Sequence, residues 1–475
     1  MPDKICDLTT HISADPLGPR GFHQATLTLC RWQKWALAGA IVLLIAWGFT
    51  AIHHELLVIN TALTVFYLAS TLYRMLIIDL ALRKPRDIQV SPEEMAQPPN
   101  GKQWPRYMVI LPMYHEAEVL PGLIESLSKL DYPKDRLEIR LLIEEDDDET
   151  MPVAKSMNLQ PPFVITPIPK SYPRTKPKAC NVAIETGEAD YLVIYDAEDQ
   201  PEKDQLKKAV VAFSRCPPNV ACIQAKLAYY NWDWNLLTRC FTAEYATWFG
   251  LCLPGLDCLQ APIPLGGTSN HFRMSVLRQV GGWDEFNVTE DCDLGLRLFT
   301  AGWRTRVLDS KTWEQACPSL PFWVKQRSRW VKGYIQTYLI HTRDFVGLHR
   351  KLGFWNSVQF HLLIGGTFVS QLINPFYWLM TILWLFVRPA GIDQYFPPLV
   401  FAMGAFCLFA GNFIFAYTSA IACVRQNVGH LAKYGLIMPA YWLMMSLGAW
   451  KGFLQLITKP HHWEKTKHFA NTSVT

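Results

Sequence analysis

Long stretches without charged side chains near both ends of the chain limit what it can fold into. Residues 35–52 and 56–73 contain no Asp, Glu, Lys or Arg, and the short segment His53-His54-Glu55 separates them. Each stretch is about long enough to cross a ~30 Å hydrocarbon layer as a helix, at ~1.5 Å per residue. We therefore predict a transmembrane hairpin. The polar and mixed segment that precedes it argues against a cleaved signal peptide.

Three further apolar segments follow a long central region. Residues 352–387 and 399–424 carry no Asp, Glu, Lys or Arg, and residues 434–457 carry only Lys451. The first segment is too long for one crossing and is interrupted at Asn374-Pro375, so we expect a surface helix followed by a crossing helix. Because Arg and Lys flank the central region on both sides, the positive-inside tendency places that region in the cytosol.

Composition agrees with an integral membrane enzyme. The chain is 50% hydrophobic and 18% charged, and its formal net charge is only +4. A protein that binds nucleic acid through the phosphate backbone needs a larger basic excess, so we expect no nucleic-acid partner. The 18 Trp, 18 Tyr and 25 Phe residues suit a membrane interface or a carbohydrate-binding surface.

The central region alternates short apolar strands with helical patterns. Residues 107–111, 139–143 and 191–195 are β-type runs, each followed by turn or acidic residues. This alternation predicts an α/β domain with a mostly parallel sheet. The chain then divides into a cytosolic N-terminal segment (1–34), a transmembrane hairpin (35–82), a linker (83–103), the α/β domain (104–338), interfacial and transmembrane helices (339–457) and a cytosolic tail (458–475).

Acidic side chains follow the second and third of these strands. Residues 144–149 are all acidic, and Asp196 and Glu198 come directly after the third strand. Ligands of such sheets gather at the carboxyl ends of the strands. Asp196 and Glu198 can reach one hard cation, which can neutralise a diphosphate, and Lys178 and Asn181 can supply phosphate or base contacts. The sequence thus indicates a nucleotide-diphosphate site, although a solvated loop explains the first cluster equally well.

Three more motifs lie farther along the domain. Gly266–Phe272 is a loop rich in glycine and hydrogen-bonding side chains, and Thr289–Asp291 opens a helix with a capping Thr and early acids. Gln326, Arg329 and Trp330 fall on one face of a helix. Ordinary helix-start electrostatics is the alternative for the two acids. A membrane-surface stripe with snorkelling basic side chains is the alternative for the Gln-Arg-Trp face.

In this order, the Asp-x-acid, Thr-Glu-Asp and Gln-x-x-Arg-Trp motifs, bracketed by transmembrane segments, resemble family 2 membrane glycosyltransferases of the cellulose-synthase and hyaluronan-synthase type. The wording IYDAEDQPEKDQL, GGTSNHFR and FNVTEDCDLGLRL is most similar to a short bacterial branch that resembles the phage-adsorption protein B group. The resemblance covers roughly residues 107–336 and, in architecture, the whole chain. It implies a GT-A-like domain, a UDP-sugar donor, Mg²⁺ or Mn²⁺ as cofactor, and inverting transfer.

The resemblance also assigns roles to residues. The side chains that would hold the nucleotide are Glu144, Glu145, Asp146, Lys178, Asp196 and Arg329. Those that would hold the metal are Asp196 and Glu198, with Asp199 as a further candidate. Asp291 would be the catalytic base, with Glu290 beside it. The residues that would bind the acceptor are Gln326, Trp330, Gly267, Thr268 and Ser269. Lys459 and Trp463 would belong to a gating segment that closes over the donor, for which a basic membrane anchor is the alternative.

We therefore expect a processive polysaccharide synthase of the bacterial inner membrane, which elongates a β-linked glycan in the cytosol and passes it through its own helices. Glycolipid synthesis on the same fold is one alternative, and a non-catalytic envelope receptor or scaffold is another. The candidates to line a sugar channel are Asn374, Tyr377, Trp378, Asn412, Tyr417, Tyr441 and Trp442.

A cytosolic tail requires an even number of crossings, whereas simple counting gives two before the domain and three after it. Either residues 352–387 pass twice through the membrane, or residues 434–457 lie along its surface.

Overall fold

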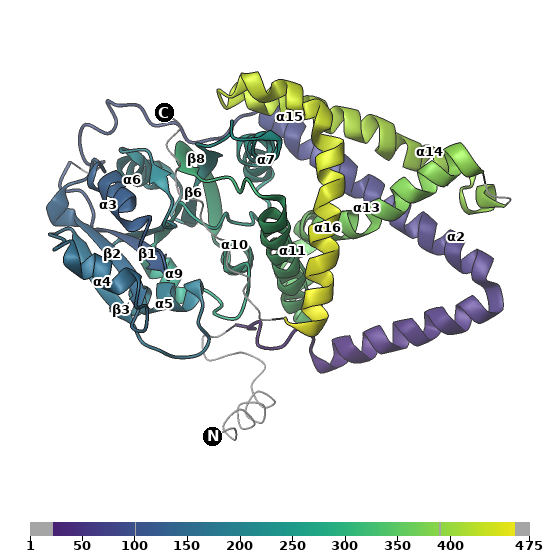
Figure 1. Ribbon diagram of the computed structural model, residues 1–475, viewed down its shortest axis with the longest axis horizontal. Coiled ribbons are helices and arrows are strands. Elements are labelled where there is room, and N and C mark those ends of the chain that lie inside the picture. Colours follow the sequence, from purple (N-terminus) through teal and green to yellow (C-terminus); the bar gives the residue numbers. More distant parts are fainter. Residues whose placement is uncertain (1–21, 100, 389–390, 461–475) are drawn as a thin grey trace.

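The computed structural model describes residues 22–99, 101–388 and 391–460, and it places an α/β domain beside a sector of long apolar helices (Figure 1). The strands of the domain are β1 (Tyr107–Met113), β2 (Leu137–Glu144), β3 (Phe163–Ile168), β4 (Tyr191–Ile194), β5 (Gln200–Pro201), β6 (Val220–Tyr229), β7 (Asn270–Arg273) and β8 (Arg304–Glu314). They form one sheet in the order β3-β2-β1-β4-β7-β6-β8-β5.

The sheet is mixed, with its parallel part where the sequence predicts it. Strands β1, β2, β3 and β4 pair in parallel, and so do β6 and β8. Strand β7 runs antiparallel to both β4 and β6, and β5 runs antiparallel to β8. This confirms the GT-A-like α/β fold class. Strand β7 lies within the segment expected to be a loop, because its four residues are too few to show a β pattern in the sequence.

Alternation along β1 divides the core of the domain into two layers. Val109 and Leu111 pack in one cluster and Met108 and Ile110 in the other, all of them fully buried, as successive side chains of a strand point to opposite faces. The helices of the two layers are α3 (Leu120–Ser128), α4 (Thr150–Ser156), α5 (Lys176–Thr186), α6 (Gln205–Arg215), α9 (Met274–Gln279) and α10 (Glu290–Thr300).

Helices α7 and α11 lie between the domain and the apolar helices (Figure 1). The helices of this region and of the apolar sector are α2 (Arg31–Arg83), α7 (Leu236–Thr247), α8 (Leu253–Cys258), α11 (Leu320–His341), α12 (Phe345–Phe360), α13 (Gly366–Ile382), α14 (Pro398–Ala405), α15 (Asn412–Arg425) and α16 (Met438–Thr458). The short turns are η1 (Lys134–Arg136), η2 (Trp248–Cys252), η3 (Thr342–Asp344), η4 (His361–Gly365), η5 (Leu383–Val387), η6 (Ile392–Tyr395), η7 (Phe406–Gly411) and η8 (Gly429–Ile437).

Three helical stretches of the described chain are long and apolar enough to cross a membrane: Arg31–Arg83, Leu320–Val387 and Pro398–Arg425. The first is bent into the two limbs of a hairpin (Figure 1). The bend lies at Ala51, which leaves the helical region with φ −155° and ψ 55°, so the segment expected as a link at residues 53–55 is helical. Helix α12 also bends, at Gly353, whose φ of 72° suits glycine.

Helix α16 lies alongside α11 and runs across the direction of α13 and α15 (Figure 1). The two helices approach closely at two glycines of α16. A Cβ added at Gly452 would lie 2.5 Å from the carbonyl oxygen of Ser328, and one added at Gly448 would lie 2.7 Å from the Cβ of Arg327. The two solutions to the crossing count both stay predictions.

The close approach of α16 leads to a test of packing. Gly452→Ala is expected to lower the melting temperature of the detergent-solubilised protein, because the methyl group meets backbone and the helices must separate, at a cost of ~1–3 kcal/mol. Gly404→Ala is the matched control, since a Cβ at Gly404 meets no atom within 4 Å and alanine favours the helix. Equal melting temperatures for the two variants would contradict this description of the contact.

Candidate active site

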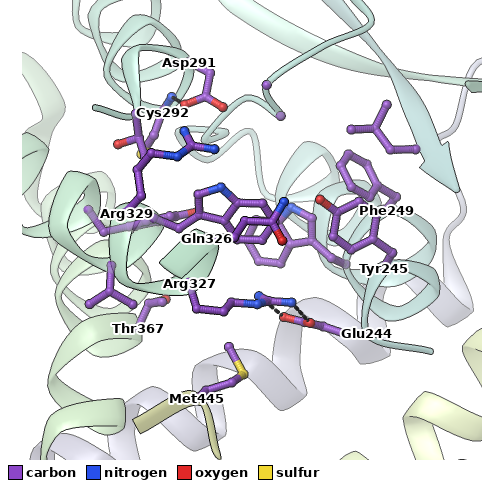
Figure 2. Close-up of a pocket in the computed structure, with 18 of the residues that line it drawn as sticks. Glu244, Tyr245, Phe249, Asp291, Cys292, Gln326, Arg327, Arg329, Thr367 and Met445 are labelled. Atoms are coloured by element: carbon purple, nitrogen blue, oxygen red, sulfur yellow. Dashed lines mark hydrogen bonds and ion pairs between the residues drawn. The ribbon is translucent and has the colours of Figure 1, made fainter. Parts of the chain in front are cut away.

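A cavity of about 730 Å³ begins at the carboxyl ends of β2 and β4 and continues between the apolar helices. On the domain side its charged lining includes Lys176, Asp196 and Asp291, and on the helix side its polar lining includes Asn374 and Asn412. Aromatic and aliphatic side chains lie between these two ends. Figure 2 shows the middle of the cavity, with Asp291 and Arg329 on one side and Glu244 and Tyr245 on the other.

The turn after β4 carries the carboxylates of Asp196 and Glu198 into the cavity. Asp199, which is 1% exposed, holds this turn: its Oδ2 accepts a hydrogen bond from the backbone N–H of Asp196 at 2.8 Å and another from the hydroxyl of Thr268. Burial and the neighbouring carboxylates raise the pKa of Asp199 well above its usual range. Asp199 therefore shapes the turn and does not line the cavity, and its role as a further metal ligand stays a prediction.

Lys176, the first residue of α5, was missed by the sequence analysis. Its ammonium forms an ion pair with Asp196 and donates a hydrogen bond to the carbonyl oxygen of Gly267 at 3.0 Å. Although burial opposes the charge, the carboxylates of Asp196 and Glu290 raise the pKa of Lys176 above its ordinary value. A cation is thus fixed beside the proposed diphosphate site.

Lys178 and Asn181 do not line the cavity, and their role at the nucleotide stays a prediction. The ammonium of Lys178 donates to the carbonyl oxygens of Pro169 at 2.6 Å and Ser171 at 3.3 Å and lies 3.4 Å from Glu144 Oε2. Asn181 bonds the backbone of Trp283 in both directions. Lys176, which faces the cavity, and Lys178 are two positions apart on α5, and residues two apart on a helix point to different faces.

The acidic residues after β2 also differ in whether they line the cavity. Glu144 lines the cavity together with Arg174. Asp146 does not line it, and its carboxylate pairs with Arg174 at 2.6 Å and Lys170 at 3.4 Å. Glu145 is exposed and outside the cavity lining. Of the three acids expected at the nucleotide, only Glu144 faces this cavity.

The glycine-rich loop contributes backbone rather than hydroxyl groups. Gly267 lines the cavity, and a Cβ added to it would lie 3.5 Å from Asp291 Oδ2. Thr268 and Ser269 are 1% and 0% exposed. Their hydroxyls donate to the carbonyl oxygen of Ile194 at 3.0 Å and to Thr312 Oγ1 at 2.7 Å. Both side chains are buried because the loop leads directly into strand β7, and a role for these residues at the acceptor stays a prediction.

A further carboxylate, Glu314, reaches the cavity from the end of β8. Burial and the charges of Asp199, Glu198 and Asp196 raise its pKa well above the usual range. The sequence analysis identified no strand at residues 304–314, so nothing indicated that Glu314 shares a wall with the pair after β4. When ionised, Asp196, Glu198 and Glu314 together are an oxygen donor set of the kind that a hard divalent ion prefers.

A second acidic group lies outside this wall. In the described part of the chain, His115, Asp147 and Asp148 have potential ligand atoms within 4.8 Å of one another. Asp147 Oδ2 already accepts a hydrogen bond from the backbone N–H of His115 at 2.8 Å, and its Oδ1 accepts one from Thr150 at 2.8 Å. This group stabilises the loops after β1 and β2 and is distinct from the Asp196–Glu198 pair.

Glu290 and Asp291 begin α10 and both line the cavity. Asp291 Oδ1 accepts a hydrogen bond from the backbone N–H of Cys292 at 2.7 Å, and burial raises the pKa of Asp291 above its ordinary value. Glu290 is 5% exposed, and burial together with the charge of Asp291 raises its pKa to about 7. The pair offers a carboxylate that can take up a proton.

The pKa of Glu290 leads to a prediction about stability. Between the ordinary value of 4.5 and the folded value of about 7, the folded protein binds more protons than the unfolded chain, so stability falls as pH rises through this window. Glu290→Gln is expected to remove up to ~3 kcal/mol of that dependence, seen as a flatter plot of melting temperature against pH. Glu188→Gln, at a side chain 90% exposed, is the control. A slope unchanged in Glu290→Gln would contradict the assignment.

The Gln-x-x-Arg-Trp residues of α11 lie together on the cavity wall, as their spacing predicts. Figure 2 shows the guanidinium of Arg329 on the same side as Asp291. Trp330 stacks on Tyr245 with ring centroids 6.4 Å apart. Among the described residues, the buried Oε1 atom of Gln326 has no hydrogen-bond partner, so this amide oxygen can accept a hydrogen bond from a ligand.

Arg327, which the sequence analysis did not single out, fixes this face of α11. It is 4% exposed, its Nη1 donates to Glu244 Oε1 at 2.8 Å, and its Nη2 donates to the hydroxyl of Tyr441 at 2.8 Å. Its guanidinium lies 4.6 Å from the ring centroid of Trp330. Arg327 thereby joins α11 to α7 and α16 beside the ring of Trp330. We call the stacked rings of Trp330 and Tyr245 the aromatic plate. The Arg-x-Arg spacing of Arg327 and Arg329 is the sequence feature that could have identified Arg327.

The remaining expectations concern the channel and the gate. Asn374, Asn412 and Trp442 line the cavity, whereas the candidates that do not are Tyr377, Trp378, Tyr417 and Tyr441. Tyr417 is 69% exposed on the apolar surface. Lys459 caps the end of α16 and is exposed, and Trp463 lies outside the described residues.

Comparison with known proteins identifies a related family. Residues 191–388 match the model of glycosyl transferase family group 2. The chain is 26% identical to the probable glycosyltransferase YdaM of Bacillus subtilis over 303 residues, which are 60% of this chain and 72% of that protein. It is 26% identical to glucomannan 4-beta-mannosyltransferase 2 of Arabidopsis thaliana over 314 residues, which are 62% of this chain and 55% of that protein.

The chain therefore spans little more than half the length of that plant relative. A solved structure, the mannosyltransferase PcManGT from Pyrobaculum calidifontis in complex with GDP-Man and Mn²⁺, matches with a TM-score of 0.52 at 18% identity, covering 85% of this chain and 99% of that chain. This likeness shows a shared fold. The sequence matches thus show similarity to family 2 glycosyltransferases, and the structural match shows a shared GT-A-like fold.

Proposed function

We propose that this protein is a membrane glycosyltransferase that transfers a hexose from a UDP-sugar, with inversion, onto a growing β-linked glycan and passes the product between its apolar helices. The observation that carries the proposal is the continuous cavity. It joins the carboxylates after β4 to Asp291 and then to the polar side chains Asn374 and Asn412 among the apolar helices. A donor site, a base and an exit path for a polar chain thus lie in one space.

At the donor end, Asp196 and Glu198 would hold Mg²⁺ or Mn²⁺, which neutralises the diphosphate as it departs. Lys176 and Arg329 are placed to add positive charge at the same group, since both line the cavity within electrostatic reach of Glu290 and Asp291. Glu144 lies on the side where the base and ribose would bind. Positive charge fixed at the leaving group stabilises the transition state.

At the acceptor end, Asp291 takes the proton from the attacking hydroxyl while the new bond forms at the anomeric carbon and the bond to the diphosphate breaks. Trp330 offers its ring to the acceptor sugar, and Gln326 offers its free amide oxygen. Arg327 holds the Trp330 ring in position from behind. No covalent sugar–enzyme intermediate is required.

The nucleobase of the donor is the first feature to test, because one observation favours a GDP-sugar as a second class of donor. The matched structure PcManGT holds GDP-Man and Mn²⁺, and a plant relative is a glucomannan mannosyltransferase. Purified protein is incubated with UDP-glucose, UDP-N-acetylglucosamine, UDP-galactose or GDP-mannose and either Mg²⁺ or Mn²⁺, and nucleotide release is measured. Release from none of the donors would overturn the proposed activity.

Product size distinguishes polymer synthesis from glycolipid synthesis, the alternative on the same fold. A processive synthase is expected to make long chains at low enzyme concentration, and a glycolipid synthase is expected to stop after one sugar. A product with a single added sugar would overturn the proposed channel, but it would agree with the proposed transferase activity.

The expected location is a bacterial inner membrane with the α/β domain in the cytosol, which the basic residues flanking the domain support. Trypsin added outside intact spheroplasts should spare the domain and should cleave it in inverted vesicles. Cleavage in intact spheroplasts would place the domain outside.

A further inference from the structure

Arg74 of α2 places a guanidinium in the wall of the cavity, where the apolar helices meet the α/β domain. Within the part of the chain that the structure describes, its one hydrogen bond is to Thr367 Oγ1 at 3.4 Å, a long contact, and it forms no ion pair with a carboxylate. Two other cations of the cavity contrast with it, since Lys176 pairs with Asp196 and Arg327 pairs with Glu244.

The position of Arg74 along α2 sets its depth in the membrane. It follows the charge-free stretch 56–73 directly and precedes Arg83 by nine positions, or ~14 Å along a helix. In the orientation proposed above, the guanidinium lies where the hydrocarbon layer meets the cytosolic headgroups. An unpaired charge at that depth is costly and indicates a functional partner.

Three polar side chains surround Arg74, and we call the four residues Ser70, Arg74, Thr367 and Gln371 the Arg74 cluster. Ser70 and Arg74 lie one turn apart on α2, as do Thr367 and Gln371 on α13, so each pair shares a helix face. The two faces meet, since a Cβ added at Gly366 would lie 2.7 Å from Ser70 Oγ. All four residues line the cavity.

Two members of the Arg74 cluster have unused hydrogen-bonding atoms. Ser70 is 2% exposed, and neither its hydroxyl nor Gln371 Oε1 has a hydrogen-bond partner within the described ranges of the chain. Leaving a buried polar group without a partner is unfavourable, and a rotated Gln371 amide presents its NH₂ in the same place. The hydroxyl of Thr367 donates to the carbonyl oxygen of Leu363 at 2.6 Å, which leaves the Ser70 hydroxyl, the Gln371 amide and the guanidinium as a donor set for an anion. A neutral glycan would leave the positive charge uncompensated.

The Arg74 cluster lies within reach of the reaction centre. Tyr334 of α11 lines the cavity and interacts electrostatically with both Asp291 and Arg74. In the view of Figure 2, Arg329 lies between Asp291 and Thr367. An anion at Arg74 would therefore belong to the molecule whose hydroxyl Asp291 deprotonates, or to a group joined to it.

We propose that the Arg74 cluster binds the phosphate of a lipid-linked acceptor, that is, a sugar or glycan joined to a membrane lipid through a phosphate or diphosphate ester. The inference rests on the proposed transferase function and names its acceptor class. The apolar side chains of the cavity lining suit the lipid chain, and they include Leu363, Phe415, Met438 and Met445. The depth of Arg74 selects a lipid headgroup over a soluble phosphate.

The test compares charged and uncharged acceptors on one enzyme in nanodiscs. The sugar identified with the donor panel is supplied either on a polyprenyl phosphate or as an octyl glycoside. Arg74→Gln is expected to raise KM for the phosphate-linked acceptor about ten- to hundredfold, the range for a lost charge-assisted hydrogen bond, with less than a ~2-fold change for the octyl glycoside. Arg74→Lys, which keeps the charge but not the paired donors, should fall between Arg74→Gln and the unmodified protein.

Arg83→Gln is the matched control, because Arg83 lies on the same helix with its side chain 75% exposed, and it should change neither KM. An equal loss on both acceptors would make Arg74 a glycan contact and overturn the proposal, and so would no loss on either.

Direct binding covers the case in which neither acceptor is turned over. A fluorescent polyprenyl phosphate should bind the protein in nanodiscs saturably, and its Kd should rise about ten- to hundredfold in Arg74→Gln. The absence of saturable binding would overturn the proposal, and displacement by inorganic phosphate at matched concentration would point to a soluble phosphate. Nucleotide release by the unmodified protein without acceptor tests the transferase function separately.

Discussion

Asp291→Asn is expected to lower turnover by ~10²–10⁴, the usual contribution of a positioned general base, while nucleotide affinity stays nearly unchanged. The substitution keeps the size of the side chain and removes its ability to take a proton. The hydrogen bond from the backbone N–H of Cys292 at 2.7 Å can still be accepted by the amide oxygen, so the start of α10 should be preserved. Turnover is measured as nucleotide release and affinity by calorimetry.

Asp135→Asn is the matched control, because the side chain of Asp135 is 78% exposed and far in sequence from the cavity residues. It should behave as the unmodified protein. If Asp291→Asn keeps near-normal turnover, Asp291 is not the base. Glu290 is then the next candidate, since its pKa of about 7 also suits proton transfer near neutral pH.

Asp196→Ala is expected to abolish nucleotide binding that depends on a divalent cation, with a Kd raised by at least ~100-fold for the loss of one charged ligand. One carboxylate, that of Glu198, is left to hold the ion after β4. The variant also frees Lys176 from its ion pair, so residual binding should depend on this lysine rather than on metal. Calorimetry with and without a chelator separates the two contributions.

Asp131→Ala provides the control for Asp196→Ala, because Asp131 is 55% exposed and pairs with Lys207 on the surface. Its nucleotide affinity should be unchanged with and without metal. Chelator-insensitive binding and turnover in the unmodified protein would refute a metal role, and would leave Lys176 and Arg329 as the positive charges at the diphosphate.

Local patterns in the sequence predict many of the helices, strands and cavity residues of this protein. Charge-free stretches predict the apolar helices, because a helix that contacts lipid needs apolar side chains over its whole length. Strands β1, β2 and β4 appear as short β-branched and aliphatic runs. The cavity residues Asp196, Glu198, Asp291, Gln326, Arg329 and Trp330 were all identified from short motifs, and all line one space.

Other features depend on details that local patterns do not resolve. Lys176 and not Lys178 faces the cavity because α5 begins at Lys176, and a shift of two residues turns a side chain to another face of a helix. Thr268 and Ser269 are buried because the loop ends in β7, which forms only where β4 and β6 hold it on both sides.

The tertiary structure alone brings distant segments together. Arg74 meets Thr367 from a position 293 residues away, and Arg327 meets Tyr441 across 114 residues. Hydropathy and motif spacing act over a few turns of chain, so they determine which segments are helices, strands or charged turns. Which faces then touch is set by packing, through contacts such as Gly366 on Ser70 and Gly452 on Ser328, and these contacts decide that the carboxylate wall, the aromatic plate and the Arg74 cluster share one cavity.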